Sequence, residues 1–110
     1  MRKERVEVLL KQSIATLISQ KKIADGRIGF VTITAVRVSP DFSTARVYYS
    51  HFGPLKDRKK TRDGLKTAAG YIQAQLSKQV YLKKLPKLHF YPDEGLAKGF
   101  EVTEALKDLD

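Results

Sequence analysis

The sequence predicts an α+β domain in which a three-stranded sheet is covered by helices on one face. Apolar residues recur at helical spacing in two long segments, and three short segments are rich in β-branched and aromatic residues typical of strands. Each helix has one apolar stripe to bury, and each strand has one apolar face. Two packed layers satisfy both requirements, because the helices and the sheet then cover each other.

The first helix is expected over residues 3–20. Its polar residues include Lys3, Glu7 and Lys11, which are expected on the solvent side. The turn signal Asp25-Gly26 follows the segment. The apolar stripe consists of Val6, Leu9, Leu10, Ile14, Leu17 and Ile18. A stripe of this regularity predicts that the helix docks on another layer.

Residues 30–38 and 45–52 indicate two strands, joined by turn residues at 39–43. A connection this short predicts an antiparallel hairpin. In the second strand, three apolar residues alternate with three residues expected to face outward: Ala45, Val47 and Tyr49 against Arg46, Tyr48 and Ser50.

The alternation of the first strand is imperfect. Strict alternation places Val31, Ile33 and Ala35 on one face, and Val36 and Val38 on the other. The pattern predicts either a bulge near Ala35–Val36 or partial burial of both faces.

A second helical region is expected after Gly53-Pro54, with Asp57 as a candidate N-cap and a kink at residues 68–70. Its buried stripe downstream of the kink is Ile72, Leu76 and Val80. Residues 87–91 indicate a third strand, and residues 93–110 an acidic tail with a short C-terminal helix. The whole chain, 1–110, is expected to form a single domain.

Charge is the first indication of function, because the formal net charge is +9. Residues 93–110 hold six acids and two bases, a net charge of −4, so residues 1–92 carry +13. A body this basic attracts polyanions, since neutralising phosphates releases counterions. The composition therefore favours a nucleic-acid-binding protein.

The candidate RNA-binding residues are a basic run, a small-residue kink and a lysine cluster before the third strand. The kink is expected to bring a helix start with free N–H groups near Gly70, where phosphate binds well. These candidates are Lys59, Lys60, Arg62, Lys66, Ala68, Ala69, Gly70, Lys78, Lys83, Lys84 and Lys87.

Other chemistries find little support in the sequence. There is no cysteine, and His51 and His89 lack the close partners that a metal site or a general base would have. We therefore expect no enzymatic activity, metal or cofactor. We also expect a cytoplasmic protein, because no signal peptide or membrane-spanning run is found.

A family resemblance extends over almost the whole chain. It starts at Arg5-Val6 and runs through four ordered patterns to Asp93. The patterns are Asp25-x-Arg27-x-Gly29-Phe30 with Thr32-x-Thr34-x-Val36-x-Val38-Ser39, Asp41-x-Ser43-x-Ala45-x-Val47-Tyr48, Ala68-x-Gly70-Tyr71-Ile72, and Leu82 with Pro86-x-Leu88-x-Phe90. In order and spacing the chain resembles the ribosome-binding factor A family.

The resemblance implies a type II KH-like fold of order α-β-β-α-(kink)-α-β, in which an Ala-x-Gly kink replaces the glycine-rich loop that clamps nucleic acid. It also implies a monomer that binds the small (30S) ribosomal subunit through 16S rRNA and assists its late maturation. Processing of the rRNA 5′ end and growth in the cold are further implied roles.

The chain departs from the family pattern at three positions. Gln73 stands where the family usually has Arg, Lys83 where it often has Arg, and Lys87 where it often has an acid. A phosphate contact at position 73 is thus in question. Two alternatives remain open: a generic KH-type binder of single-stranded RNA or mRNA, and a membrane-surface or protein-docking module led by the first helix.

Overall fold

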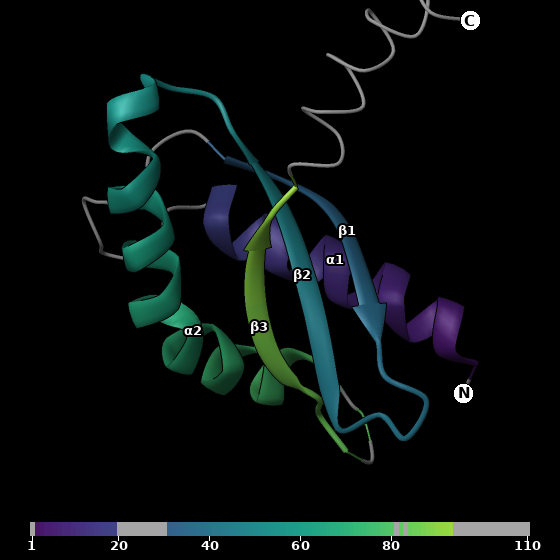
Figure 1. Ribbon diagram of the computed structural model, residues 1–110. Helices are drawn as coiled ribbons and strands as arrows, with labels where there is room; N and C mark the ends of the chain where they lie inside the picture. Colours follow the sequence, from purple (N-terminus) through teal and green to yellow (C-terminus); the bar gives the residue numbers. More distant parts are fainter. Residues whose placement is uncertain (1, 20–30, 81, 83, 94–110) are drawn as a thin grey trace, which may run out of the picture.

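The computed structural model describes residues 2–19, 31–80, 82 and 84–93 (Figure 1). The predicted C-terminal helix lies outside the described residues, which end at Asp93. The elements, in chain order, are α1 (Lys3–Ser19), β1 (Val31–Val38), β2 (Thr44–His51), the 3-10 turn η1 (Leu55–Asp57), α2 (Arg58–Gln79) and β3 (Lys87–Pro92).

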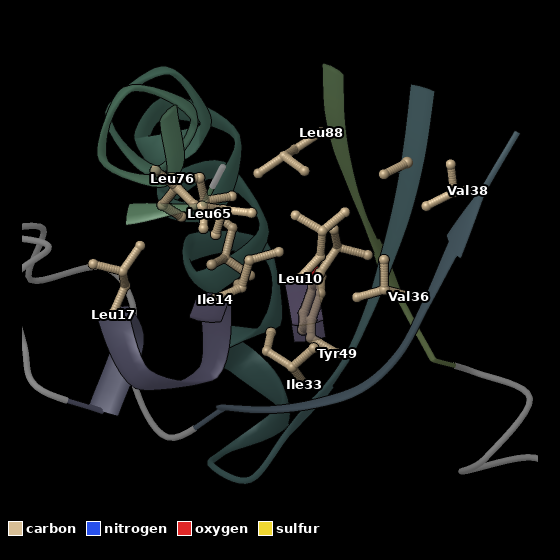
Figure 2. Packing of buried hydrophobic residues seen from close by; sticks show 14 of the residues in the cluster. Leu10, Ile14, Leu17, Ile33, Val36, Val38, Tyr49, Leu65, Leu76 and Leu88 are labelled. Atoms are coloured by element: carbon tan, nitrogen blue, oxygen red, sulfur yellow. The ribbon is translucent and has the colours of Figure 1, made fainter. Parts of the chain in front are cut away.

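The three strands form one sheet of order β1-β2-β3. The hairpin strands β1 and β2 are antiparallel, as predicted, whereas β3 is parallel to β2. Parallel neighbours need a crossover connection, and α2 supplies it. Figures 1 and 2 show both helices on the same side of the sheet, which confirms the predicted two-layer α+β fold.

The core lies between the helices and the sheet (Figure 2). Val6, Leu10, Ile14 and Leu17 of α1 are all buried, while Leu9 and Ile18 pack at its margin. Burying a side chain of this size contributes about 1.5–3 kcal/mol. α2 adds Leu65, Ala68, Ile72 and Leu76, and the sheet adds Ile33, Val36, Val38, Ala45, Val47, Tyr49 and Leu88.

The imperfect alternation of β1 reflects a β-bulge, one of the two predicted alternatives. Its pairing with β2 shifts between Ile33 and Ala35. The extra residue brings Ile33, Val36 and Val38 to the same, helix-covered face. Strict alternation, which would place Val36 and Val38 away from Ile33, therefore does not hold in β1, and the bulge alternative is confirmed. In β2 the predicted alternation is confirmed, because Ala45 and Val47 are buried and Arg46 is exposed.

Two further expectations need correction. Glu7 is not on a free solvent face: its carboxylate accepts a hydrogen bond of 2.8 Å from the Val38 backbone N–H. Strand β1 is at the edge of the sheet, so this N–H has no strand partner. Asp57 occupies the N-cap position of α2, but its side chain makes no capping bond, because the turn η1 leads directly into the helix.

The β1–β2 connection is held by side chains that bond the turn backbone. Asp41 accepts hydrogen bonds from the hydroxyls of Ser39 and Ser43, at 2.8 and 2.7 Å, and from the Ser43 N–H. Phe42 has φ +60°, a left-handed conformation that costs a non-glycine residue energy. Its ring packs against the core, which offsets that cost.

The hydrogen bonds to Asp41 predict a pH-dependent stability. They lower the pKa of its carboxyl from 3.8 to about 2, the Ser43 hydroxyl being the largest cause. A carboxyl whose folded pKa is depressed stabilises the fold above its unfolded pKa, and this contribution is lost as pH falls towards the folded value. We expect Asp41→Asn to lower the melting temperature at neutral pH. The difference in melting temperature between variant and parent should disappear as the pH falls from about 4 to about 2. Thermal unfolding followed by circular dichroism measures this difference. A difference independent of pH would contradict this role.

Candidate nucleic-acid interface

The outer surface of α2 carries most of the predicted RNA-binding residues. Its inner stripe is buried, so the opposite positions must face solvent. Lys59, Arg62, Lys66 and Gly70 recur at intervals of three and four residues, and all are exposed. By helical geometry they form one stripe about 16 Å long. We call these four residues the α2 stripe.

The helix is continuous through the predicted kink. It runs without interruption from Arg58 to Gln79, and Figure 1 shows that it changes direction partway along. The predicted bend is therefore present, but the predicted helix start near Gly70 is wrong. Gly70 does not have a positive φ, and its neighbours Ala68 and Ala69 are the best helix formers, so the helix has no reason to break.

Gly70 is not required by packing within the described part of the chain. It is exposed, and a Cβ built on it would meet no described atom within 4 Å. Ala68, by contrast, is buried in the core, and Ala69 is partly buried beside it. The small side chain at 68 therefore serves the fold, whereas the missing side chain at 70 leaves bare backbone on the α2 stripe.

Gln73 has an internal role. Its side-chain amide donates to the Pro86 carbonyl oxygen at 2.7 Å, and its carbonyl oxygen accepts from the Leu88 N–H at 3.0 Å. These two bonds fasten α2 to the start of β3. The departure at position 73 thus replaces a candidate phosphate contact with a structural one.

The remaining predicted cations do not gather on the α2 stripe. Lys60 lies beside the buried face of α2, outside the α2 stripe. Lys78 lies in the last turn of the helix, where a cation interacts favourably with the helix dipole. Lys84 is exposed before β3, and Lys83 lies outside the described residues. Lys87 begins β3 beside Thr44, so it belongs to the sheet.

The structure also reveals polar residues that the candidate set left out. On the sheet face opposite the helices, Arg37, Arg46 and His89 stand in one row of the strand register, and Ala35, Tyr48 and Tyr91 in the next. A side-chain hydrogen bond with Tyr48 raises the pKa of Arg46 above its usual value. The alternation of β2 already placed Arg46 and Tyr48 on the outward face. The sequence did not show that β3 pairs with β2 and brings His89 and Tyr91 beside them.

His51 has a structural environment. Its Nε2 lies 3.2 Å from the Pro54 carbonyl oxygen, and its Nδ1 lies 3.1 Å from the Thr61 hydroxyl. Since a carbonyl can only accept, Nε2 donates to Pro54, while Nδ1 and the Thr61 hydroxyl share the second hydrogen bond. Through these two contacts the His51 ring links the connection after β2 to the first turns of α2.

Comparison with known proteins gives a consistent result. The ribosome-binding factor A family model matches residues 2–106. Curated ribosome-binding factors A from Desulfitobacterium hafniense and Geobacter sulfurreducens are 37% and 36% identical over 108 and 109 residues. These alignments cover 98% and 99% of this chain, and 86% and 92% of the relatives.

Solved structures agree with this match. The crystal structure of ribosome-binding factor A from Thermus thermophilus has a TM-score of 0.72 at 30% identity, covering 84% of this chain and 97% of that one. A Thermus thermophilus homology model fitted into the cryo-electron-microscopy map of a 30S complex has a TM-score of 0.66 at 31% identity, covering 79% and 90%.

The fold and surface define a small α+β domain of KH-like architecture, with a basic outer stripe on the helix that crosses between its parallel strands. The family model and the curated relatives match nearly the full length, and the solved structures match 84% and 79% of the chain. The chain belongs to the ribosome-binding factor A family.

The role of Gln73 can be tested by truncation. Gln73→Ala leaves the buried Leu88 with an unpaired N–H, and we expect the free energy of unfolding to fall by about 1–3 kcal/mol. Chemical denaturation measures it. Gln75→Ala, also partly buried on α2, is the control and should cost less. Equal losses for the two variants would show that the bonds to β3 contribute little.

Gly70 should show the opposite effect on stability. Gly70→Ala adds a methyl group to open space within a helix, so we expect the free energy of unfolding to rise by about 0.5–1 kcal/mol. Denaturant titration of parent and variant gives the difference. A destabilised variant would mean that the bend of α2 needs glycine.

Proposed function

We propose that this member of the ribosome-binding factor A family binds the immature small (30S) ribosomal subunit through 16S rRNA and assists its late maturation. In this proposal the protein acts in the cytoplasm as a monomer, by binding rather than by catalysis. Processing of the rRNA 5′ end and growth in the cold depend on it.

The observation that carries the proposal is the α2 stripe on a chain of this family. Three exposed cations, Lys59, Arg62 and Lys66, follow one another along the helix and lead to Gly70. The cations neutralise phosphates, and the bare backbone at Gly70 lets a nucleic-acid backbone approach closely. The 30S complex described for the Thermus thermophilus relative supports the small subunit as partner.

The membrane-surface alternative loses its main support. It requires the apolar stripe of α1 to be free, but Val6, Leu10, Ile14 and Leu17 are at most 2% exposed and pack in the core. Within the described part of the chain, neither helix is long and apolar enough to cross a bilayer. The generic RNA-binding alternative predicts no preference among ribosomal particles.

The decisive experiment is co-sedimentation with purified small subunits, large subunits and intact ribosomes at increasing salt. We expect selective, salt-sensitive pelleting with small subunits. The variant Lys59→Gln, Arg62→Gln, Lys66→Gln keeps helix propensity but removes three charges. Its affinity should fall at least about tenfold, and the slope of log affinity against log salt should decrease by about 2–3.

The control removes three charges from α1, as Lys3→Gln, Arg5→Gln, Lys11→Gln. These exposed residues start near the N-terminus, which Figure 1 places far from the first half of α2. If control and test variants weaken binding equally, net charge alone drives association and the α2 stripe is not the interface. Equal pelleting with all particles would instead favour the generic RNA binder.

A further inference from the structure

The face of the sheet opposite the helices carries a basic and aromatic surface. Because side chains alternate along each strand, residues next to the core positions point to this face. We call it the open sheet face. Its members on β2 and β3 are Thr44, Arg46, Tyr48 and Ser50, and Lys87, His89 and Tyr91; β1 contributes Thr32 and Arg37.

Two arginines stand directly opposite each other on this face. Arg37 pairs with Arg46 in the β1–β2 register, and both are exposed. Like charges at directly opposite positions destabilise a sheet. Among the described residues no carboxylate bridges the two guanidinium groups. Arg37 donates to the carbonyl oxygen of its neighbour Val36, and Arg46 lies over the Tyr91 ring. An anion between them would convert this repulsion into attraction.

An exposed aromatic ring adjoins this charge. Tyr91 is 44% exposed, and the Arg46 Cζ lies 5.9 Å from its ring centroid. The Tyr48 ring is 6.0 Å from the Tyr91 ring, between centroids, at a tilt of 34°. Lys87 adds a cation two residues before His89, at the hairpin end of the same face. An exposed ring beside cations is a feature by which proteins hold an unpaired base together with its phosphates.

We propose that the open sheet face is a second RNA-binding surface, which takes a single-stranded segment. Arg37 and Arg46 engage its phosphates, and an unpaired base stacks on Tyr91. A double helix does not offer this base face, so the surface selects single strands. It is separate from the α2 stripe, which lies on the helical layer, and the inference does not require the ribosomal partner to be correct.

The test maps binding of a short single-stranded RNA of mixed sequence by nuclear magnetic resonance of the isotope-labelled full chain. We expect amide signals of Arg46, Tyr48 and Tyr91 to shift on titration. The same length of double-stranded RNA should shift them less. Shifts confined to α2 would overturn this inference and leave the proposed function standing, whereas no shift on either surface would count against both.

Matched variants separate charge from stacking. Arg37→Gln, Arg46→Gln should weaken single-strand binding more than Lys3→Gln, Lys11→Gln on α1, which removes the same charge. Tyr91→Leu should lower the affinity for single-stranded RNA about fivefold to a hundredfold. Tyr91→Phe should retain most of the parent affinity, because the aromatic ring is kept.

The alternative occupants have their own outcomes. Equal shifts of the open sheet face with polyglutamate at the same salt would show a general anion site, and would overturn base stacking. If Tyr91→Phe loses as much affinity as Tyr91→Leu, base stacking on the ring would likewise be overturned. Pelleting of these variants with small subunits, measured separately, keeps this inference distinct from the role of the α2 stripe.

Discussion

Both helices bury their apolar stripes against the same face of a three-stranded sheet, and the other features of the molecule depend on this constraint. It orients α2 so that Lys59, Arg62 and Lys66 point outward. Among the described residues no helix covers the second face of the sheet, and outward residues of β2 such as Arg46 are exposed. One packing arrangement thus generates two polar surfaces on opposite layers.

Within α2, structural and exposed roles are divided by position around the helix. Leu65, Ala68 and Ile72 fill the core, and Gln73 at the margin fixes the start of β3 through two hydrogen bonds. Gly70 has no packing neighbour to accommodate within the described chain. The sequence pattern Ala68, Gly70 and Ile72 therefore combines two kinds of position. Ala68 and Ile72 pack in the core, whereas Gly70 leaves the helix backbone exposed.

The sequence was sufficient for elements whose periodicity is regular. The stripe of α1 and the alternation of β2 are simple repeats, and both were predicted correctly. In β1, one extra residue reversed the faces of Val36 and Val38, because no local feature separates a bulge from two-sided burial. The bonds of Gln73 could not be foreseen, since they depend on where Pro86 lies after the crossover.

The candidate site was predictable to a similar degree. Arg62 and Lys66 were candidates from the basic run, and the structure places both on one exposed face of α2. Spacing could not show that Lys87 belongs to the sheet, nor that Tyr91 stands beside Tyr48, because both facts follow from the parallel register of β3. Residues that meet only through tertiary pairing leave no periodic signal in the chain.

The hydrogen bond from Val38 to Glu7 has a consequence for association between molecules. A free strand edge is a template on which another chain can add a strand. At the end of β1 a second copy would have to displace the Glu7 carboxylate before pairing with the Val38 N–H. At the opposite edge β3 is only six residues long and ends in Pro92, which has no N–H to offer. Both borders of this small sheet therefore discourage edge-to-edge aggregation.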